Sequence, residues 1–404
     1  MNEQRPVPRE RKPDQSKIAA GAIIKPQDKV VIKGGMDRAM LIIVILLLCY
    51  GSVMVFSASY AYALSSRGDS FYFIKRQVIW ALVGVTAMLI VAHLDYKLFY
   101  KFTWTYYGIV CLLLLAVLVF GISAGDAQRW LVIPGVGFTV QPSELMKLGL
   151  VLALAKYLSI NEERAFNSRK KWYPVKYGLL FPMGIVLLAC GLVALERHFS
   201  GTIILFLIGV VVIFVAGGRL NWILGAGGAF AAAIVLAISF VPYARQRIDI
   251  WLHPENYSSQ GEVWQTLQGL NAVGSGGFFG VGLGQSWQKH MFVSQPQNDF
   301  IFSIICEELG FIGALSVIAL FIAFVWRGLV IASRAPDTYS RLVVVGITSK
   351  IAVQAILNML VVTGMIPNTG ISLPFFSYGG SSLSILLVEV GIILSISRYS
   401  YREK

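Results

Sequence analysis

Long apolar runs separated by short polar segments set the pattern of the chain. Each run reaches or approaches the roughly 20 residues that a helix needs to cross a bilayer. The runs are continuous and do not alternate with polar residues, so the pattern predicts spanning helices rather than the strands of a barrel. The ten expected spans are residues 39–56, 77–92, 104–122, 145–158, 177–195, 202–216, 222–241, 300–325, 342–365 and 383–396.

The polar segments between these spans predict the sidedness of an all-α polytopic membrane protein with about ten transmembrane helices. Lys and Arg gather before the first span and in residues 164–176 and 327–341, which places these segments in the cytoplasm. An even number of spans then puts both termini on the cytoplasmic side. The expected regions are a basic, disordered tail (1–38), a ten-span domain (39–398) with outer loops at 123–143, 242–299 and 366–382, and a cytoplasmic C-terminus (399–404). The outer loop between the seventh and eighth helices is the largest.

Composition agrees with a membrane protein. Of the 404 residues, 56% are hydrophobic and only 14% are charged, whereas soluble proteins carry roughly a quarter charged residues. The net charge of +13 comes from cations that flank apolar runs, so membrane anchoring explains it better than nucleic-acid binding. The four cysteines fall in apolar runs without CxxC or metal-type spacing, which predicts buried, unpaired thiols. The polar stretch before the first run is too long for a cleavable signal peptide.

The first polar segment with candidate chemistry is "GDAQRWLVIPGVGFTVQPSELMK". Ser143 is expected to cap the helix that follows, and Glu144 and Lys147 share one face of that helix because they are three residues apart. Such a pair either satisfies itself as a structural ion pair or, together with Arg129, attracts an anionic head group. Trp130 is typical of the aromatic belt at a membrane interface.

A second segment, "QPQNDFIFSIICEELGFIG", carries three carboxylates toward the membrane. Asp299 is expected in the first turn of the eighth span, where the helix dipole stabilises it and where it also presents a carboxylate at the membrane surface. Glu307 lies roughly 12 Å deeper and about 80° around the helix, so it does not pair with Asp299. Glu307 and Glu308 point apart, and at least one of them needs a buried partner such as Lys350 or a backbone amide.

Two further outer segments are polar or rich in glycine. Gln265 and Gln268 are three residues apart and are expected to face one way. The stretch "GSGGFFGVGLGQS" lacks the lysine and the serine or threonine of a phosphate-binding loop, and it predicts a flexible loop or re-entrant turn buried against protein. In "MIPNTGISLPFFSYGGSSL", Ser377 and Tyr378 are polar at membrane depth, which indicates either a loop plug or the lining of a substrate groove.

These motifs together resemble the signatures of the SEDS family (shape, elongation, division and sporulation), in the same order and over nearly the whole chain. The stretch "CEELGFIGA" and the long N-terminal tail are more similar to the FtsW and SpoVE members of the family than to RodA. One stretch departs from the family pattern. Where members often carry "QPDLGT", this chain has "ERHFSGT", so the usual acidic residue is absent and His198 lies nearby.

The resemblance implies a peptidoglycan glycosyltransferase. Such proteins polymerise lipid II, a disaccharide–pentapeptide on undecaprenyl pyrophosphate, at the outer face of the bacterial cytoplasmic membrane. The FtsW and SpoVE likeness implies a role in cell division or sporulation at the septum. Asp299 matches the essential acidic residue of the family, and Trp130, Glu144 and Lys147 match positions that are important in it. The other substrate-binding candidates are Arg129, Gln141, Gln265, Gln268, Ser377 and Tyr378.

The chemistry of that reaction suits these residues. Joining a sugar hydroxyl to an anomeric carbon needs a base, for which Asp299 is the candidate. The pyrophosphate leaving group needs cations, for which Arg129 and Lys147 are the candidates. A divalent cation (Mg²⁺ or Mn²⁺) can share that work, although no ligand cluster is visible in the sequence. The α-linked donor and β-linked product of the family imply inversion by a single displacement.

Two other functions stay open at this stage. The chain is alternatively a lipid II flippase, or a non-catalytic scaffold for division proteins. The resemblance also implies a class B penicillin-binding protein, a transpeptidase, as a partner, alongside other division proteins. The basic tail is either a solvated anchor or a binding segment for such proteins and for anionic membrane lipid.

Overall fold

The structure is a computed structural model of the chain. It describes residues 29–124, 127–132, 139–166, 168, 170, 172–240, 242–256, 262–290, 292–293 and 295–403. Most of the predicted disordered tail, residues 1–28, lies outside this range, as does the middle of the first outer loop.

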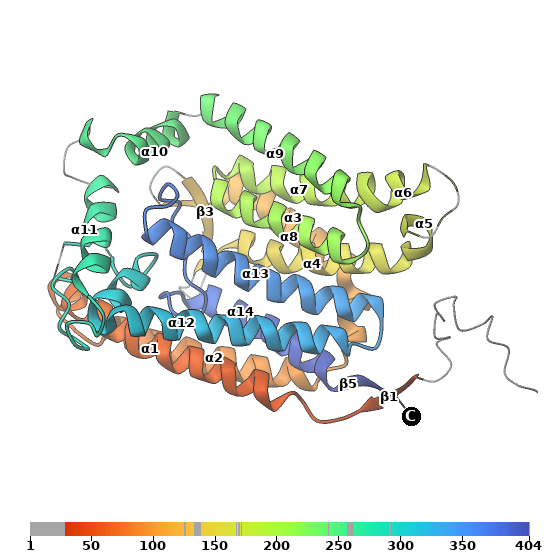
Figure 1. Ribbon diagram of the computed structural model, residues 1–404, viewed down its shortest axis with the longest axis horizontal. Coiled ribbons are helices and arrows are strands. Elements are labelled where there is room, and N and C mark those ends of the chain that lie inside the picture. Colours follow the sequence, from red (N-terminus) through yellow and green to blue (C-terminus); the bar gives the residue numbers. More distant parts are fainter. Residues whose placement is uncertain are drawn as a thin grey trace, which may run out of the picture.

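In the described part of the chain, ten long helical segments form an elongated bundle (Figure 1), which confirms the predicted all-α polytopic class. Seven are long and apolar enough to cross a membrane: α1 (Arg38–Arg67), α2 (Tyr72–His93), α3 (Lys97–Phe120), Tyr173–Leu195, α12 (Ile301–Ser333), α13 (Thr338–Val362) and α14 (Gly380–Ser397). The segment Tyr173–Leu195 consists of α6 (Tyr173–Val175), a π-helical turn (Lys176–Leu180) and α7 (Phe181–Leu195). The remaining three are α4 (Pro142–Ile160), which carries Glu144, Lys147 and Lys156, and the apolar helices α8 (Phe199–Val215) and α9 (Leu220–Phe240). Short α5 (Glu162–Phe166) follows α4.

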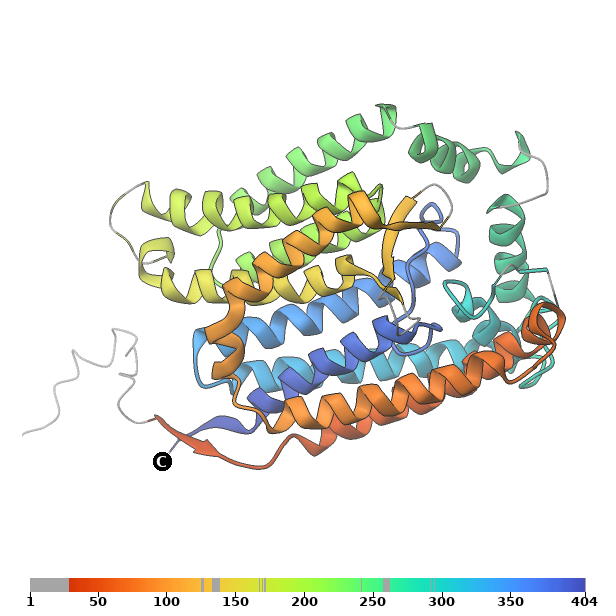
Figure 2. The same ribbon diagram turned by 180° about the vertical axis from the view of Figure 1, so that it is seen from behind.

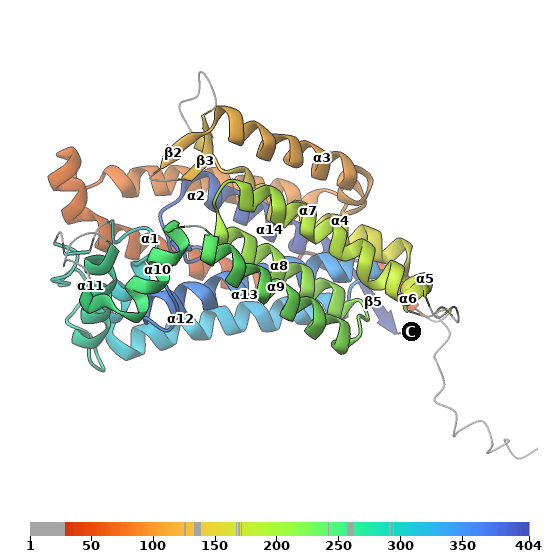
Figure 3. The ribbon, with the colours of Figure 1, turned by 90° about the horizontal axis from the view of Figure 1, so that it is seen from above.

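The first and last described residues, Lys29 and Glu403, pair at one end of the bundle, in keeping with the even number of predicted spans. Strand β1 (Lys29–Lys33), in the segment expected to be a disordered tail, pairs antiparallel with β5 (Tyr399–Glu403). Asp37 then caps α1 by accepting a hydrogen bond from the Met40 amide at 2.8 Å. The Asp37 carboxylate also accepts a 2.9 Å hydrogen bond from Nε of Arg327 on α12. We call this the inner end, and the opposite end, with α10 (Pro242–Leu252) and α11 (Glu262–Ser275), the outer end (Figure 3).

Glycines allow α2 and α14 to pack closely side by side. A β-carbon added at Gly84 would lie 2.5 Å from the Leu387 side chain, and one added at Gly391 would lie 2.7 Å from the Met88 carbonyl oxygen. Small residues at such contacts let helix backbones approach within a membrane. Seen from behind, α2 and α3 run along this face of the bundle (Figure 2).

Two folded regions cover the outer end. Strands β2 (Ile122–Ala124), β3 (Ala127–Val132) and β4 (Thr139–Val140) form a small antiparallel sheet between α3 and α4. The large outer loop folds into α10 (Pro242–Leu252), a 3₁₀ turn (Pro254–Asn256) and α11 (Glu262–Ser275). Trp251 of α10 donates a 2.8 Å hydrogen bond to the Gly364 carbonyl, so this loop rests on the end of α13.

The glycine-rich stretch after α11 fills a break in α12. Gly310 has φ 66° and ψ −160°, which interrupts the helix. The amides of Val281 and Gly282 donate to the carbonyls of Glu307 and Glu308 at 2.9 and 3.0 Å. The Phe311 amide, on the other side of the break, donates to the Gly277 carbonyl at 3.0 Å. Residues 276–282, here called the glycine turn, therefore satisfy backbone groups that the break would leave unpaired, as spanning segments require.

Candidate functional site

Asp299 lies at the junction of α12 with the loop between α13 and α14. The sequence predicts Asp299 in the first turn of the eighth span. Helix α12 begins at Ile301, however, so Asp299 precedes the first helical turn. The Asp299 carbonyl accepts a 2.7 Å hydrogen bond from Nδ2 of Asn358, which also donates to the Ile371 carbonyl at 2.6 Å. One carboxylate oxygen of Asp299 lies 3.8 Å from the position of a β-carbon on Gly370. The half-buried Asp299 thus faces the outer loop 363–379.

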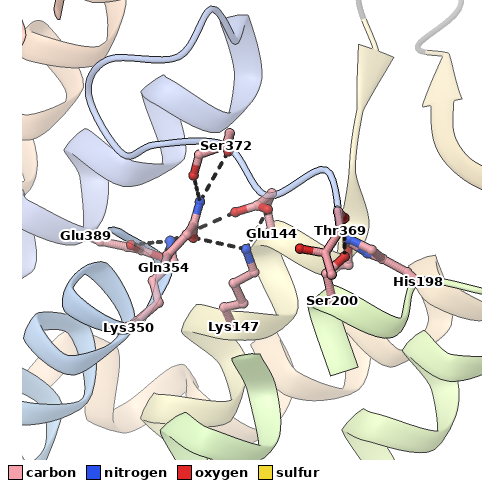
Figure 4. A network of polar contacts seen from close by, with 10 residues as sticks. Glu144, Lys147, His198, Ser200, Lys350, Gln354, Thr369, Ser372 and Glu389 are labelled. Carbon is pink, nitrogen blue, oxygen red and sulfur yellow. Dashed lines mark hydrogen bonds and ion pairs between the residues drawn. The ribbon is translucent and has the colours of Figure 1, made fainter. Parts of the chain in front are cut away.

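A network of buried charges lies between α4, α13 and α14 (Figure 4). Lys147 donates to Glu144 at 2.6 Å and to the Gln354 side chain at 3.2 Å. Lys350 binds Glu389 at 2.7 Å and lies 4.0 Å from Glu144. We call this set the bundle cluster: Glu144, Lys147, Lys350, Gln354 and Glu389. The predicted pair of Glu144 and Lys147 is present, and it is one part of a larger network.

The bundle cluster is electrically balanced, with two carboxylates and two ammonium groups. Lys147 is 2% exposed and Lys350 is 3% exposed. Buried charges at membrane depth are tolerated when each has a counter-charge and hydrogen bonds. Each charged group here has both, so the cluster is stable as a closed unit in the described conformation.

A small cavity adjoins the bundle cluster. Its volume is about 20 Å³, and its lining includes Glu144, Gln354, Ser372, Ser377 and Ser382. A volume of this size suffices for about one water molecule. The cavity lies between the bundle cluster and the loop that faces Asp299, because residues of both line it. The two are also bonded directly, since Nε2 of Gln354 donates to the Ser372 carbonyl at 3.1 Å. Ser377, predicted to line a groove or a plug, lies on this cavity.

The stretch "ERHFSGT", where the chain departs from the family pattern, connects α4 with the loop 363–379. Nδ1 of His198 lies 3.2 Å from the Ser143 hydroxyl, and Ser200 donates to the Thr369 carbonyl at 2.9 Å. Burial, with Arg129 and Lys147 nearby, lowers the pKa of His198 to about 3, so the imidazole is neutral at physiological pH. The prediction that Ser143 caps α4 is wrong: Gln141 occupies the N-cap position and Pro142 the first turn, because Ser143 turns toward His198.

The other predicted site residues occupy the outer end. On β3, Arg129 donates to the Arg197 carbonyl at 2.8 Å, and the neighbouring Trp130 is half-buried. The Tyr378 ring packs edge-on against Phe73 at 5.0 Å between ring centroids, and the Tyr378 amide donates to the Gln297 carbonyl at 2.8 Å. Tyr378 therefore holds the chain two residues before Asp299.

The two predicted glutamines lie on α11. Gln268 accepts a 3.1 Å hydrogen bond from Asn271. A β-carbon added at Gly269 would lie 2.7 Å from the Phe300 ring, so this part of α11 contacts the residue that follows Asp299. Gln265 and Gln268 are both half-buried on the same helix. Their contact with substrate stays a prediction.

Apart from Ser57 of α1, the partners of Glu307 and Glu308 lie in residues 286–289, between α11 and α12. The proposal of Lys350 as a partner is wrong, because Lys350 binds Glu389 on α14. Glu308 instead binds Lys289 at 2.6 Å, and Glu307 accepts a 2.9 Å hydrogen bond from the Trp287 backbone amide. The backbone-amide alternative is therefore confirmed for Glu307.

Three polar residues of this region were not assigned to the site from the sequence: Gln354, Asn358 and Glu389. A signal for two of them existed. Lys350, Gln354 and Asn358 recur every four residues in an apolar span, so they form a polar stripe on one face of α13. The stripe runs from the bundle cluster to Asp299. Glu389 offered no such spacing, since it is the single charged residue of α14.

No group of three or more His, Cys, Asp or Glu side chains in the described ranges is arranged to hold a metal ion. The described residues therefore offer no ligand set that fits the divalent cation considered from the chemistry.

The fold and the buried network define a class: a polytopic helical membrane protein that concentrates polar side chains near the outer end. The chain belongs to the SEDS family, because the FtsW/RodA/SpoVE family profile, described as a cell cycle protein, matches residues 37–402. It is 41% identical over 372 residues to Stage V sporulation protein E of Bacillus subtilis (strain 168), covering 90% of this chain and 97% of that protein. It is 38% identical over 363 residues to "Probable peptidoglycan glycosyltransferase FtsW" of Trichlorobacter lovleyi, covering 89% and 93%.

Solved structures share the fold. The chain superposes with a TM-score of 0.73 on a chain of the solved structure "Structural coordination of polymerization and crosslinking by a peptidoglycan synthase complex". The two are 28% identical, and the match covers 90% of this chain and 98% of that chain. The rod shape determining protein RodA of Thermus thermophilus superposes with a TM-score of 0.66 at 27% identity, covering 90% and 97%. The similarity to FtsW, SpoVE and RodA confirms the family that the motifs indicated.

Proposed function

We propose that this chain is a peptidoglycan glycosyltransferase that polymerises lipid II at the outer face of the bacterial cytoplasmic membrane. The name of one relative, the probable peptidoglycan glycosyltransferase FtsW of Trichlorobacter lovleyi, supports this class of activity. The observation that carries the proposal is the setting of Asp299. Its backbone is held by Asn358, and its carboxylate lies beside Gly370 at the outer end.

Asp299 acts as the general base in this proposal. It lies just before a spanning helix and is half-buried, so a sugar on an outer-leaflet lipid reaches it without entering the bilayer. The carboxylate takes the proton of the acceptor hydroxyl while that oxygen attacks the anomeric carbon of the donor. The bond from this carbon to the pyrophosphate oxygen breaks in the same displacement, which inverts the configuration.

Arg129 is the cation better placed to meet the leaving pyrophosphate. It lies half-buried on β3 at the outer end, and its guanidinium has several donors for phosphate oxygens. Lys147 is 2% exposed and is bonded to Glu144 and Gln354. We therefore infer that Lys147 holds the bundle cluster together and that its effect on the reaction is indirect.

The partner and the cellular role are part of the same proposal. A chain with this fold belongs to a peptidoglycan synthase complex, which supports a membrane partner. We propose a class B penicillin-binding protein transpeptidase as that partner. We also propose location at the division septum and a role in division or sporulation, which the sporulation relative and the description of the family as a cell cycle protein support.

The test is polymerisation of lipid II by the purified full chain, with and without the transpeptidase. Asp299→Asn should lower the rate by at least about 100-fold, because general base catalysis contributes 10²–10⁴-fold. Asp69→Asn is the matched control. Asp69 is an outer-end carboxylate that binds exposed Lys75 at 2.9 Å, and its loss should leave the rate unchanged.

Other outcomes favour the other functions. If Asp299→Asn polymerised at the wild-type rate, Asp299 would not be the base. If the wild type made no glycan with its partner but moved lipid II across liposomes, the chain would be a flippase. If Asp299→Ala complemented a null strain, a scaffold function would replace the enzymatic one.

A further inference from the structure

A second network of buried charge lies outside the candidate site. It lies between the break in α12 and the outer loop that joins α11 to α12. Both oxygens of each carboxylate have partners. Glu308 accepts from Lys289 at 2.6 Å and from the Ser57 hydroxyl of α1 at 2.5 Å. Glu307 accepts from the Trp287 amide at 2.9 Å and from the Ser286 hydroxyl. We call this set the loop cluster: Ser57, Ser286, Lys289, Glu307 and Glu308.

Lys289 is the centre of the loop cluster. Its side chain and that of Glu308 are both 0% exposed. The Tyr60 ring of α1 covers the ammonium group, whose nitrogen lies 4.7 Å from the ring centroid. A cation over an aromatic face is stabilised further when it is desolvated. One lysine therefore joins α1, α12 and the outer loop at a single point.

The loop cluster and the glycine turn together determine the path of the chain to Asp299. The glycine turn is bonded through its backbone to Glu307 and Glu308, and Lys289 binds the side chain of the same Glu308. Asp299 follows ten residues later, where the Gln297 carbonyl accepts the Tyr378 amide. The outer loop is thus anchored on both sides of the stretch that leads to Asp299.

We propose that Lys289 is a positioning residue: its buried ion pair with Glu308 sets the register of the outer loop on α12 and thereby the position of Asp299. The alternative is that the pair only adds stability. A buried ion pair is a weak source of stability, because well-packed apolar residues often replace it without loss. Such pairs are best attested as devices that select one register among several. The inference rests on the proposed function of Asp299.

The test compares three variants of the full chain: Lys289→Arg, Lys289→Met and the double variant Lys289→Met/Glu308→Leu. The double variant leaves no unpaired charge in the pair, so it separates register from stability. We expect its melting temperature to stay close to that of the wild type. Its kcat for lipid II polymerisation should fall by about 10- to 100-fold with little change in KM, since small misplacement of a catalytic group has effects of this size. Lys289→Arg, which keeps the positive charge, should keep most of the wild-type rate of lipid II polymerisation.

A second readout does not depend on activity. Hydrogen exchange of the amides in residues 285–300 should be faster in the double variant, because the loop opens locally without its anchor. Lys75→Met, which removes an exposed outer-end lysine, should change neither exchange nor rate. Wild-type kcat in the double variant would overturn the proposal, and so would unchanged exchange in residues 285–300. A wild type that is inactive on lipid II would contradict the proposed function, while the exchange result would still decide whether Lys289 orders the loop.

Discussion

The bundle cluster and the loop cluster both bury carboxylates against lysines, yet their surroundings differ. In the loop cluster every carboxylate oxygen accepts a hydrogen bond, and Lys289 and Glu308 are completely buried. In the bundle cluster Lys350 lies within 4.0 Å of two carboxylates, those of Glu144 and Glu389. The bundle cluster also adjoins a cavity of about 20 Å³, whose lining includes serines of the outer loop.

This difference separates two uses of buried charge. A lysine with two carboxylates within reach can change partners at little electrostatic cost, which suits a network next to a charged ligand. A lysine with one carboxylate has a single favourable arrangement, which suits a network that fixes a loop. We therefore expect the loop cluster to control structure and the bundle cluster to respond to what binds at the outer end.

The largest effect is expected from removing one carboxylate of each cluster. Glu308→Leu leaves the Lys289 ammonium buried with the Tyr60 ring, and such unpaired charges cost about 3–5 kcal/mol of unfolding free energy. Glu389→Leu leaves Lys350 with Glu144 at 4.0 Å, so we expect a smaller loss of about 1–3 kcal/mol. Denaturation of both variants in the same detergent measures the difference. An equal or larger loss in Glu389→Leu would remove the distinction between the clusters.

An intermediate effect is expected at the glycine turn, whose backbone is bonded to Glu307 and Glu308 of the loop cluster. A β-carbon on Gly276 would overlap the carbonyl oxygen of Cys306 in α12. We expect Gly276→Ala to lower the unfolding free energy by about 1–3 kcal/mol, the usual cost of overpacking. Gly274→Ala is the matched control, because Gly274 is in α11 and a β-carbon there would meet nothing within 4 Å.

The control has an expected sign of its own. Alanine in a helix is favoured over glycine by about 0.5–1 kcal/mol, so Gly274→Ala should be neutral or stabilising. Thermal unfolding of the two variants measures both effects. A Gly276→Ala variant as stable as Gly274→Ala would show that the glycine turn does not pack tightly into the break of α12.

What the sequence predicted well depended on short spacings. The ten spans follow from hydrophobic runs, and the pair of Glu144 and Lys147 follows from a separation of three residues on one helix. The position of Asp299 at the end of a spanning helix follows from its place before an apolar run. Each of these features depends on residues that are close together in the sequence, so it can be predicted from the sequence alone.

What the sequence did not predict depended on contacts between distant segments. Lys289 and Glu308 are 19 residues apart and meet because the chain turns back onto α12. Lys350 and Glu389 are 39 residues apart on different helices, so their pairing depends on how α13 and α14 pack. Gly310 gave no sign of a break, because an isolated glycine within a hydrophobic run is compatible with a helix.

The smallest effect is expected at Glu196, a buried carboxylate that belongs to neither cluster. It is 2% exposed, and neither of its oxygens has a hydrogen-bond partner among the described residues. Burial raises the pKa of Glu196 to about 8 from an ordinary value of 4.5, although nearby Arg129 opposes the shift. Glu196 therefore lacks, among the described residues, the hydrogen-bond donors that hold the carboxylates of the two clusters, and it is expected to be mostly protonated at neutral pH.

The sign of the pH dependence follows from these pKa values. Below about pH 4.5 the folded and unfolded chains both carry the proton on Glu196, and between about pH 4.5 and 8 only the folded chain keeps it. Stability from this group is therefore present at low pH and is lost as the pH rises to about 8. Glu196→Gln should remove that part of the slope, so its melting temperature should change less between pH 5 and 8 than that of the wild type. Melting curves across this range measure the slope. Identical slopes in the wild type and in Glu196→Gln would mean that Glu196 is ionised in the folded protein and is held by a cation such as Arg129.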